Sequence, residues 1–313
     1  MPKILFASNN IADFPGMPAY TENGSYDPAR VPYSIRAISG VRARTAQFDP
    51  TTTEYTWVHY SIYTSNPYSN DLVNLYDKNG VFLLSVAHDD GFVTIKTKRG
   101  TAVTDEDFQG PVSTNFKFTM DVAVRITALA TEYVVYLGGN YIGEGSNAGN
   151  LPGGVNQPQH LELEGGLFNP AISEIILADG DTRNSRLNVL APIAIGEYSE
   201  WNGDLSTLQD SDDTTGLTTT EAEKRQSFTL AGYTGSANIS NVVAISSTIR
   251  GINAPESLSH SVRLNSLDYY GDAQDVEKFK TMQVTDWELN PATSLPWTKA
   301  DLTNVEVGFK SIA

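Results

Sequence analysis

The chain contains no cysteine. Disulfide bonds, thiolate metal sites and cysteine nucleophiles are therefore excluded, and stability must come from packing, strand pairing or assembly. No segment approaches the ~20 consecutive apolar residues of a membrane-spanning helix. The apolar run Ile4–Ala7 is also too short for a secretory signal, so we expect a protein that is made in a cytoplasm and is not exported by the general secretory route.

Basic residues are scarce. The 21 Lys and Arg face 37 Asp and Glu, which gives a net charge of −16 spread along the chain. Phosphate binding needs a basic stripe, and none is present, so nucleic acid and anionic membranes are not expected as partners. Charged residues make up only 19% of the chain, and much of its polarity comes from Ser, Thr, Asn and Gly. That mixture is typical of proteins built from strands and turns.

Helical periodicity is also scarce, whereas strand patterns occur along the chain. The most informative run is Asp71–Lys98, in which three short apolar segments are joined by Asp77–Gly80 and Asp89–Gly91. Asn and Asp tolerate left-handed backbone and Gly adopts it freely, so these joints reverse the chain tightly. The run predicts an antiparallel meander with a buried face. The strands predicted in this half are Val31–Arg44, Tyr55–Tyr63, Leu72–Tyr76, Val81–Ala87, Phe92–Thr97, Phe116–Thr127, Glu132–Leu137 and Ile172–Ala178.

The 313 residues exceed the usual size of one domain, so two domains are expected. We place them at residues 1–183 and 184–313, because the texture of the sequence changes after this point and a polar loop follows at 210–220. Short helical turns are predicted at Ala273–Lys280 and Lys299–Asn304. The strands predicted in the second half are Gln226–Leu230, Val242–Arg250, Ser259–Leu267, Met282–Asp286 and Val305–Lys310.

Three stretches of the first half resemble the laminin G/concanavalin A-like jelly roll. They are Trp57–Tyr63, the strand and turn Leu72–Gly80, and the hairpin Tyr133–Gly143 followed by Ile172–Asp179. The resemblance implies an all-β protein whose first domain is a lectin-like jelly-roll sandwich. The second half is then expected to be a smaller β-sandwich.

The end of the chain has its own pattern. Pro296-Trp297-Thr298 is followed by Asp301, and Thr298 with Asp301 three residues later predicts a helix-start box. Together with Trp201 and the Asp- and Thr-rich loop at 210–216, this ending resembles a C-terminal module of tailed-bacteriophage virion proteins. The resemblance implies a module that attaches the protein to its neighbours.

Catalytic groups are poorly represented. Glu162 and Glu164 would share one face of a strand, as the paired carboxylates of a glycosidase must. The Glu-x-Asp-x-x-Glu pattern of jelly-roll glycosidases is not matched, and Leu-Glu-Leu-Glu is typical of a strand with one solvated face. The scattered histidines His59, His88, His160 and His260 do not have the spacing of a zinc site. We therefore expect no enzymatic activity.

Cofactors are not expected, although two acidic loops could bind calcium. One contains Asp210, Asp212 and Asp213, and the other contains Asp89 and Asp90. Calcium requires several oxygen ligands. A turn is a sufficient explanation for Asp89 and Asp90, and a solvated loop or an inter-subunit contact is the favoured interpretation of the other segment.

Aromatic residues give one hypothesis for a site. Trp57, Tyr60, Tyr63, Tyr68 and Tyr76 could form a platform that stacks on sugar rings. The loop after Tyr63 adds amide and hydroxyl groups, so the predicted glycan or partner contacts are Tyr63, Asn66, Tyr68 and Asn70.

The leading prediction is a virion structural protein of a tailed bacteriophage, located in the tail, the collar or the head decoration. It would act by subunit–subunit binding in a symmetric homo-oligomeric assembly, with other virion proteins as partners. The alternative is a carbohydrate-binding module that attaches the phage to host-surface polysaccharide. A glycosidase is a third possibility that the missing carboxylate pattern disfavours.

Overall fold

The computed structural model describes residues 2–64, 69–89, 91–99, 102–110, 116–149, 156–166, 169–209, 212 and 214–313; at 69–71, 89, 102 and 116 it describes the backbone only. The chain separates into two compact units, Pro2–Leu187 and Asn188–Ala313. The seam predicted from the sequence, between residues 183 and 184, lies a few residues before this division. No helix in the described ranges is long and apolar enough to span a membrane.

The first unit is built almost entirely of strands, with one 3-10 helix, η1 (Ile11–Asp13). Its strands are β1 (Ile4–Ser8), β2 (Ala19–Tyr20), β3 (Ser34–Arg36), β4 (Arg42–Arg44), β5 (Tyr55–Thr64), β6 (Ser69–Tyr76), β7 (Phe82–Asp89), β8 (Phe92–Arg99), β9 (Ala102–Gln109), β10 (Phe116–Ile126), β11 (Ala130–Leu137), β12 (Asn140–Ala148), β13 (His160–Glu164) and β14 (Ala171–Ala178).

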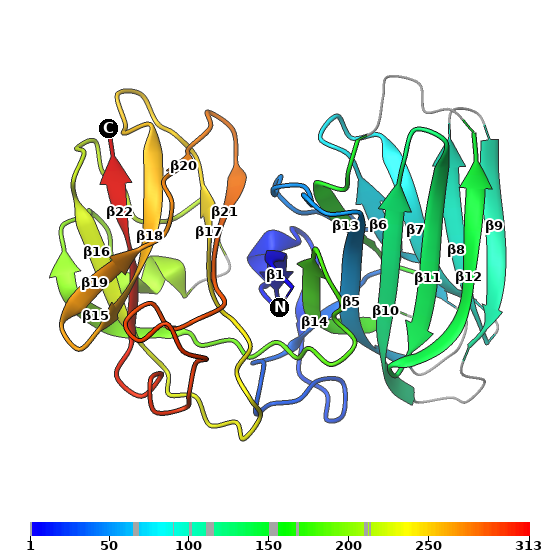
Figure 1. Cartoon of the computed structure of the whole chain (residues 1–313), viewed down its shortest axis with the longest axis horizontal. Coiled ribbons are helices and arrows are strands. Elements are labelled where there is room, and N and C mark those ends of the chain that lie inside the picture. Colours follow the sequence, from blue (N-terminus) through cyan, green and yellow to red (C-terminus); the bar gives the residue numbers. More distant parts are fainter. Residues whose placement is uncertain are drawn as a thin grey trace. The chain divides into compact units, whose positions relative to one another are not determined.

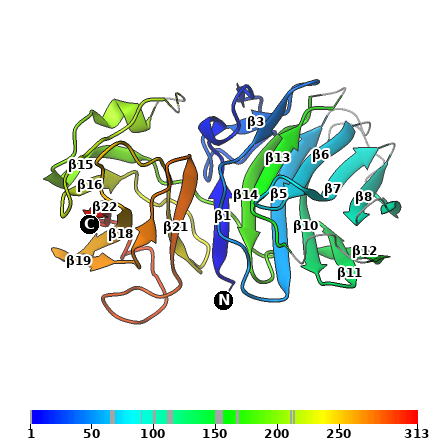
Figure 2. The same cartoon turned by 90° about the horizontal axis from the view of Figure 1, so that it is seen from above.

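These strands form two antiparallel sheets that pack face to face (Figures 1 and 2). The eight-stranded sheet has the order β12-β11-β10-β5-β14-β3-β2, with β1 paired to β14. The six-stranded sheet has the order β4-β13-β6-β7-β8-β9. The chain passes repeatedly between the sheets, as in a jelly roll. The predicted all-β class and lectin-like sandwich are thus confirmed.

The alternating direction of side chains along each strand explains which residues form the core. In β5, Val58, Tyr60 and Ile62 are fully buried between the sheets, and Leu75 and Leu84 face them from the six-stranded sheet. Successive side chains of a strand point to opposite faces, so the residues between these core positions lie on the outer faces.

The predicted meander is present as β6, β7 and β8, and its first joint has the expected chemistry. Gly80 has φ +74°, a conformation that costs glycine little. The Asp77 carboxylate accepts hydrogen bonds from the backbone N–H groups of Asn79 and Val81, both at 2.8 Å. The turn therefore fixes the register of the hairpin locally.

The second unit is a smaller sandwich, with one 3-10 helix, η2 (Leu205–Leu208). Its strands are β15 (Pro192–Ser199), β16 (Arg225–Leu230), β17 (Val242–Thr248), β18 (Ser257–Leu264), β19 (Leu267–Tyr270), β20 (Gln274–Asp275), β21 (Thr281–Trp287) and β22 (Glu306–Ile312). One sheet has the order β15-β16-β22-β18-β19, with β20 paired to β18, and the other is the β17–β21 ribbon.

The core of this unit lies between its sheet and its ribbon. Ala244, Val262, Trp287 and Trp297 pack there, and the Trp297 indole N–H donates to the backbone oxygen of Trp287 at 2.8 Å. His260, which is buried on β18, contacts both strands of the ribbon through the hydroxyl groups of Ser246 and Thr285. The Pro-Trp-Thr ending therefore serves the core of this unit.

Two local predictions are wrong, and a third is confirmed. Val31–Arg44 is not one strand: β3 and β4 belong to different sheets, and the chain crosses between them near Gly40. Ala273–Lys280 contains the short strand β20 instead of a helical turn, because its backbone pairs with β18. The prediction at the end of the chain is confirmed: Thr298 and Asp301 exchange the predicted box of hydrogen bonds, and a short turn follows in which the N–H groups of Leu302 and Thr303 donate to the backbone oxygens three residues earlier.

Candidate functional site

The predicted glycan-contact residues are only partly covered by the structure. Tyr63 lies near the end of β5 and is half-buried on the outer face of the eight-stranded sheet. Asn70 belongs to β6, where only the backbone is described, and Asn66 and Tyr68 lie outside the described residues. Contact through this loop stays a prediction.

The predicted sugar-stacking platform is wrong for two of its tyrosines. Tyr60 is fully buried, and its hydroxyl is hydrogen-bonded to His88 in the core. Tyr76 belongs to the other sheet. Alternation separates Tyr60 from Trp57 and Tyr63, which point outward from the same strand.

The aromatic surface that does form lies on the outer face of the eight-stranded sheet. We call it the aromatic ledge; it consists of Trp57 (β5), Tyr136 (β11) and Tyr141 (β12), on strands at the front of Figure 1. The rings of Trp57 and Tyr136 stack with centroids 5.7 Å apart and planes at 19°. Tyr141 meets Tyr136 edge to face at 6.0 Å and is 58% exposed.

Strand register explains why these rings meet. Ala123 of β10 is opposite Trp57, and its small side chain leaves room for the indole to reach the next strand. The Gly138–Gly139 reversal pairs Tyr136 directly with Tyr141. The ledge thus crosses four adjacent strands with its aromatic surface on one side.

A short segment after β14 closes one end of the ledge. We call Asp181–Arg183 the strap. The Arg183 guanidinium lies 4.5 Å from the Tyr136 ring centroid and 5.9 Å from that of Trp57. Its hydrogen bonds to Asp181 hold the pKa of that carboxyl below its ordinary value. Thr182 donates to the buried carboxylate of Asp121, so the strap is fixed to the sheet beneath it.

The two candidate carboxylates lie on the outer face of the six-stranded sheet. Glu162 accepts hydrogen bonds from Arg44 at 3.0 and 3.1 Å, from the Tyr76 hydroxyl at 2.9 Å and from Asn74 at 3.5 Å. Glu164 pairs with Arg42 at 2.7 Å. We call these six residues the glutamate–arginine network.

The prediction of a solvated face is wrong for Glu162, which is buried beneath its partners. The Arg44 guanidinium stacks 3.6 Å from the centroid of the Tyr76 ring and covers this part of the sheet. Burial, together with the hydrogen bond to Glu162, raises the pKa of Tyr76 to about 12. The network is neutralised internally, which suits a structural role.

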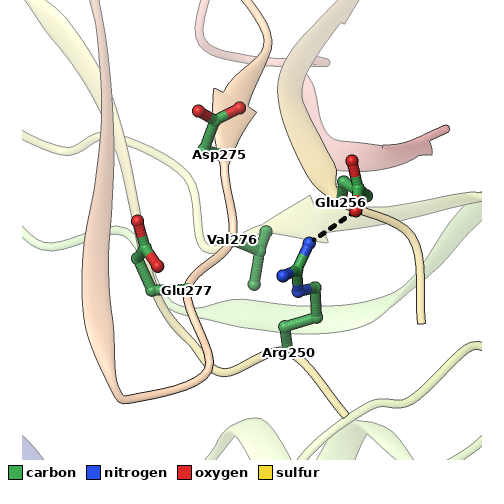
Figure 3. A pocket seen from close by; sticks show the side chains of 5 residues that line it. All are labelled: Arg250, Glu256, Asp275, Val276 and Glu277. Atoms are coloured by element: carbon green, nitrogen blue, oxygen red, sulfur yellow. Dashed lines mark hydrogen bonds and ion pairs between the residues drawn. The ribbon is translucent and has the colours of Figure 1, made fainter. Parts of the chain in front are cut away.

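The second unit contains a pocket of about 290 Å³ (Figure 3). Its lining consists of Arg250, Glu256, Asp275, Val276 and Glu277. Arg250 donates to Glu256 at 2.9 Å, so its charge is already paired. The lining contains three carboxylates but no hydroxyl or thiol nucleophile and no aromatic side chain.

Calcium at the acidic loops stays a prediction, because Asp90, Asp210 and Asp213 lie outside the described residues. Asp212 accepts hydrogen bonds from the backbone and hydroxyl of Thr214, as an ordinary turn residue does. Among the residues that the structure describes, no three His, Cys, Asp or Glu side chains lie close enough together to hold a metal ion.

Sequence comparison finds no matching protein family and no matching curated protein. Among solved structures, the endo-β-1,4-glucuronan lyase of the fungus Trichoderma reesei is 5% identical with a TM-score of 0.43, over 57% of this chain and 96% of the lyase. A galectin of Caenorhabditis elegans is 12% identical with a TM-score of 0.31, over 43% of this chain and 94% of the galectin.

The binding domain of botulinum neurotoxin DC, solved in complex with rat synaptotagmin II, is 11% identical with a TM-score of 0.39, over 86% of this chain and 68% of that domain. TM-scores in this range carry no argument about function.

Proposed function

We propose that the first unit is a non-catalytic binding module that recognises carbohydrate on the aromatic ledge. The observation that carries the proposal is the stacked pair of Trp57 and Tyr136, extended toward solvent by Tyr141. Flat rings pack on the apolar faces of sugars, and aromatic side chains supply large contact areas at low entropic cost.

We do not expect this module to hydrolyse the glycan that it binds. A glycosidase needs one carboxyl group to donate a proton and a second to attack or to activate water. Glu162 accepts hydrogen bonds from Arg44, Tyr76 and Asn74, and Glu164 is paired with Arg42. Incubation with the bound polysaccharide should therefore leave its viscosity unchanged.

A glycan array followed by calorimetry with the best glycan tests the proposal on the full chain. Tyr141→Ala should weaken binding about tenfold, which corresponds to about 1.4 kcal/mol. The variant should still fold, because Tyr141 is mostly exposed. Tyr270→Ala is the matched control, since Tyr270 is an exposed tyrosine of the second unit. Equal affinity for Tyr141→Ala and wild type would place the site elsewhere.

The virion structural role is a second candidate, and one observation favours the self-association that such a role requires. Strand β15 is at the end of its sheet in the described part of the chain, and it exposes 59% of Ile193 and 39% of Ile195. Apolar edge strands tend to pair with other chains. A carbohydrate-binding protein of a phage tail would combine both roles.

Light scattering tests this candidate. Ile193→Lys should reduce any self-association of the purified chain and leave the affinity for glycan unchanged. Negative-stain images of phage particles labelled through this chain would then test the predicted location in the virion. A chain that is monomeric at all concentrations and absent from particles would contradict the structural role.

A further inference from the structure

Four polar side chains are buried together on the outer face of the eight-stranded sheet. We call them the polar seam: Asp121 on β10, His59 and Ser61 on β5, and Ser173 on β14. Each is at most 1% exposed. They lie next to the aromatic ledge, and the strap is fixed to them through the hydrogen bond from Thr182 to Asp121.

The strand register places the four groups in one patch. Asp121 is opposite His59, and Ser61 is opposite Ser173. Directly opposed residues have Cβ atoms about 5 Å apart, and His59 and Ser61 are neighbours on the same face of β5. His59 Nδ1 and Asp121 Oδ1 are 2.8 Å apart.

Each member of the seam retains an atom without a hydrogen-bond partner. These atoms are His59 Nε2, Asp121 Oδ2, Ser61 Oγ and Ser173 Oγ, and they make up four of the eight such buried side-chain atoms in the described residues. A buried polar atom without a partner is costly, so native proteins satisfy such atoms with protein groups or ordered water. Their concentration in one patch indicates that a polar ligand is held there.

We propose that the polar seam is a binding site for ordered water. The hydrogen-bonding capacities match this ligand. His59 Nδ1 faces a carboxylate oxygen, which can only accept, so the imidazole proton is placed on Nδ1 and Nε2 remains as the acceptor. A water molecule can donate to Nε2 and to Asp121 Oδ2, and it can accept from the two serine hydroxyls. Buried waters have two to four such partners.

Ser61, His59 and Asp121 also follow the order of a charge-relay triad, but their arrangement does not support hydrolysis. Ser61 Oγ has no hydrogen bond to His59, and the seam is closed to solvent. A nucleophilic serine needs a hydrogen bond to its general base and access for the substrate. Water that links β10, β5 and β14 beneath the strap accounts for all four atoms.

A high-resolution crystal structure of the full chain is the first test. We expect at least one ordered water about 2.7–3.2 Å from two or more seam atoms. A seam without water, or one filled by another side chain, would overturn the proposal. This measurement uses the wild-type protein and does not depend on how variants fold.

Thermal unfolding of Ser173→Ala is the second test. If Ser173 binds water, the variant loses a hydrogen bond and its midpoint falls by about 2–4 °C. The control is Ser85→Ala. Ser85 Oγ is also buried without a partner, but among the described residues it is the one such atom on β7, away from the cluster that would hold the water. No fall is expected for the control. A midpoint for Ser173→Ala that is unchanged, raised or lowered only as much as the control contradicts the proposal.

Discussion

The two outer faces of the first unit differ in how their polar and aromatic side chains are partnered. On the six-stranded sheet, Glu162 is surrounded by Arg44, Tyr76 and Asn74, and the charges compensate one another. On the eight-stranded sheet, Trp57 and Tyr136 stack beside buried polar atoms that have no partner.

The difference shows how the same alternation of strand residues serves two purposes. A face whose charged groups satisfy each other has little capacity left for a ligand. A face with accessible aromatic rings has that capacity. We therefore assign stability to the glutamate–arginine network and recognition to the aromatic ledge. Three experiments test these roles, and a fourth tests the core that lies between the two faces.

Glu162→Ala should have the largest effect on stability. It leaves Arg44, Tyr76 and Asn74 without their common acceptor. Glu162 is buried but the Arg44 side chain is 36% exposed, so we expect a loss of about 3 kcal/mol, the lower end of the range for a buried ion pair. Urea unfolding should show this loss, whereas glycan affinity should not change. A Glu162→Ala variant that folds as well as wild type but no longer binds glycan would reverse our assignment of the two faces.

Acid should weaken the sandwich without distinguishing its faces. Burial lowers the pKa of His88, in the core of the first unit, to about 4 from an ordinary value of 6.5. The unfolded chain then binds a proton that the folded chain does not, so stability falls as the pH falls from about 6.5 to about 4. The expected loss is about 2–3 kcal/mol. His260 predicts a similar loss in the second unit.

Unfolding midpoints in urea between pH 7.5 and 4 would measure this loss. His88→Gln is the control, because glutamine keeps a hydrogen-bonding group near Tyr60 but does not titrate. The variant should flatten the profile of the first unit. A wild-type profile that is already flat over this interval would disprove the assignment to His88.

Trp57→Ala should remove about 2 kcal/mol of binding, or roughly thirty-fold in Kd, as expected for the central ring of an interface. Tyr63→Ala is the matched comparison, since Tyr63 points outward from the same strand but is outside the ledge. Calorimetry should show a large loss for the first variant and little change for the second. The opposite ranking would favour the loop that follows Tyr63 over the ledge.

Arg42→Ala should have the smallest effect. The Arg42 side chain is 64% exposed, and exposed ion pairs contribute less than about 1 kcal/mol. The unfolding free energy of the variant should differ little from that of the wild type, and high salt should make the difference smaller still. A loss as large as that of Glu162→Ala would mean that the outer pair is essential to the network.

Local chemistry made much of the fold predictable. The Asp77–Gly80 turn and the Gly138–Gly139 reversal each fix a hairpin within a few residues, and the strand patterns follow from period-two burial. Strand β1 and the edge strands β9 and β15 were missed. Their alternation of apolar residues is weak. Strand β1 pairs with β14 and β15 pairs with β16, both far along the chain, whereas β9 pairs with the preceding strand β8 but has few apolar residues to indicate a strand.

The candidate site was less predictable, because it depends on long-range register. Tyr136 and Tyr141 could have been paired from the reversal between them. By contrast, Arg44 is 118 positions from Glu162, so nothing local indicates that this carboxylate is buried. The place of Arg183 beside Trp57 likewise depends on how the chain returns after β14.

The distribution of tryptophan has a practical consequence. Trp57 is the only tryptophan of the first unit, whereas Trp287 and Trp297 lie in the core of the second. Intrinsic fluorescence therefore contains separate signals from the two units. After Trp201→Phe, quenching of the indole at position 57 would report a sugar arriving at the ledge, and a red shift from the other two would report melting of the second unit.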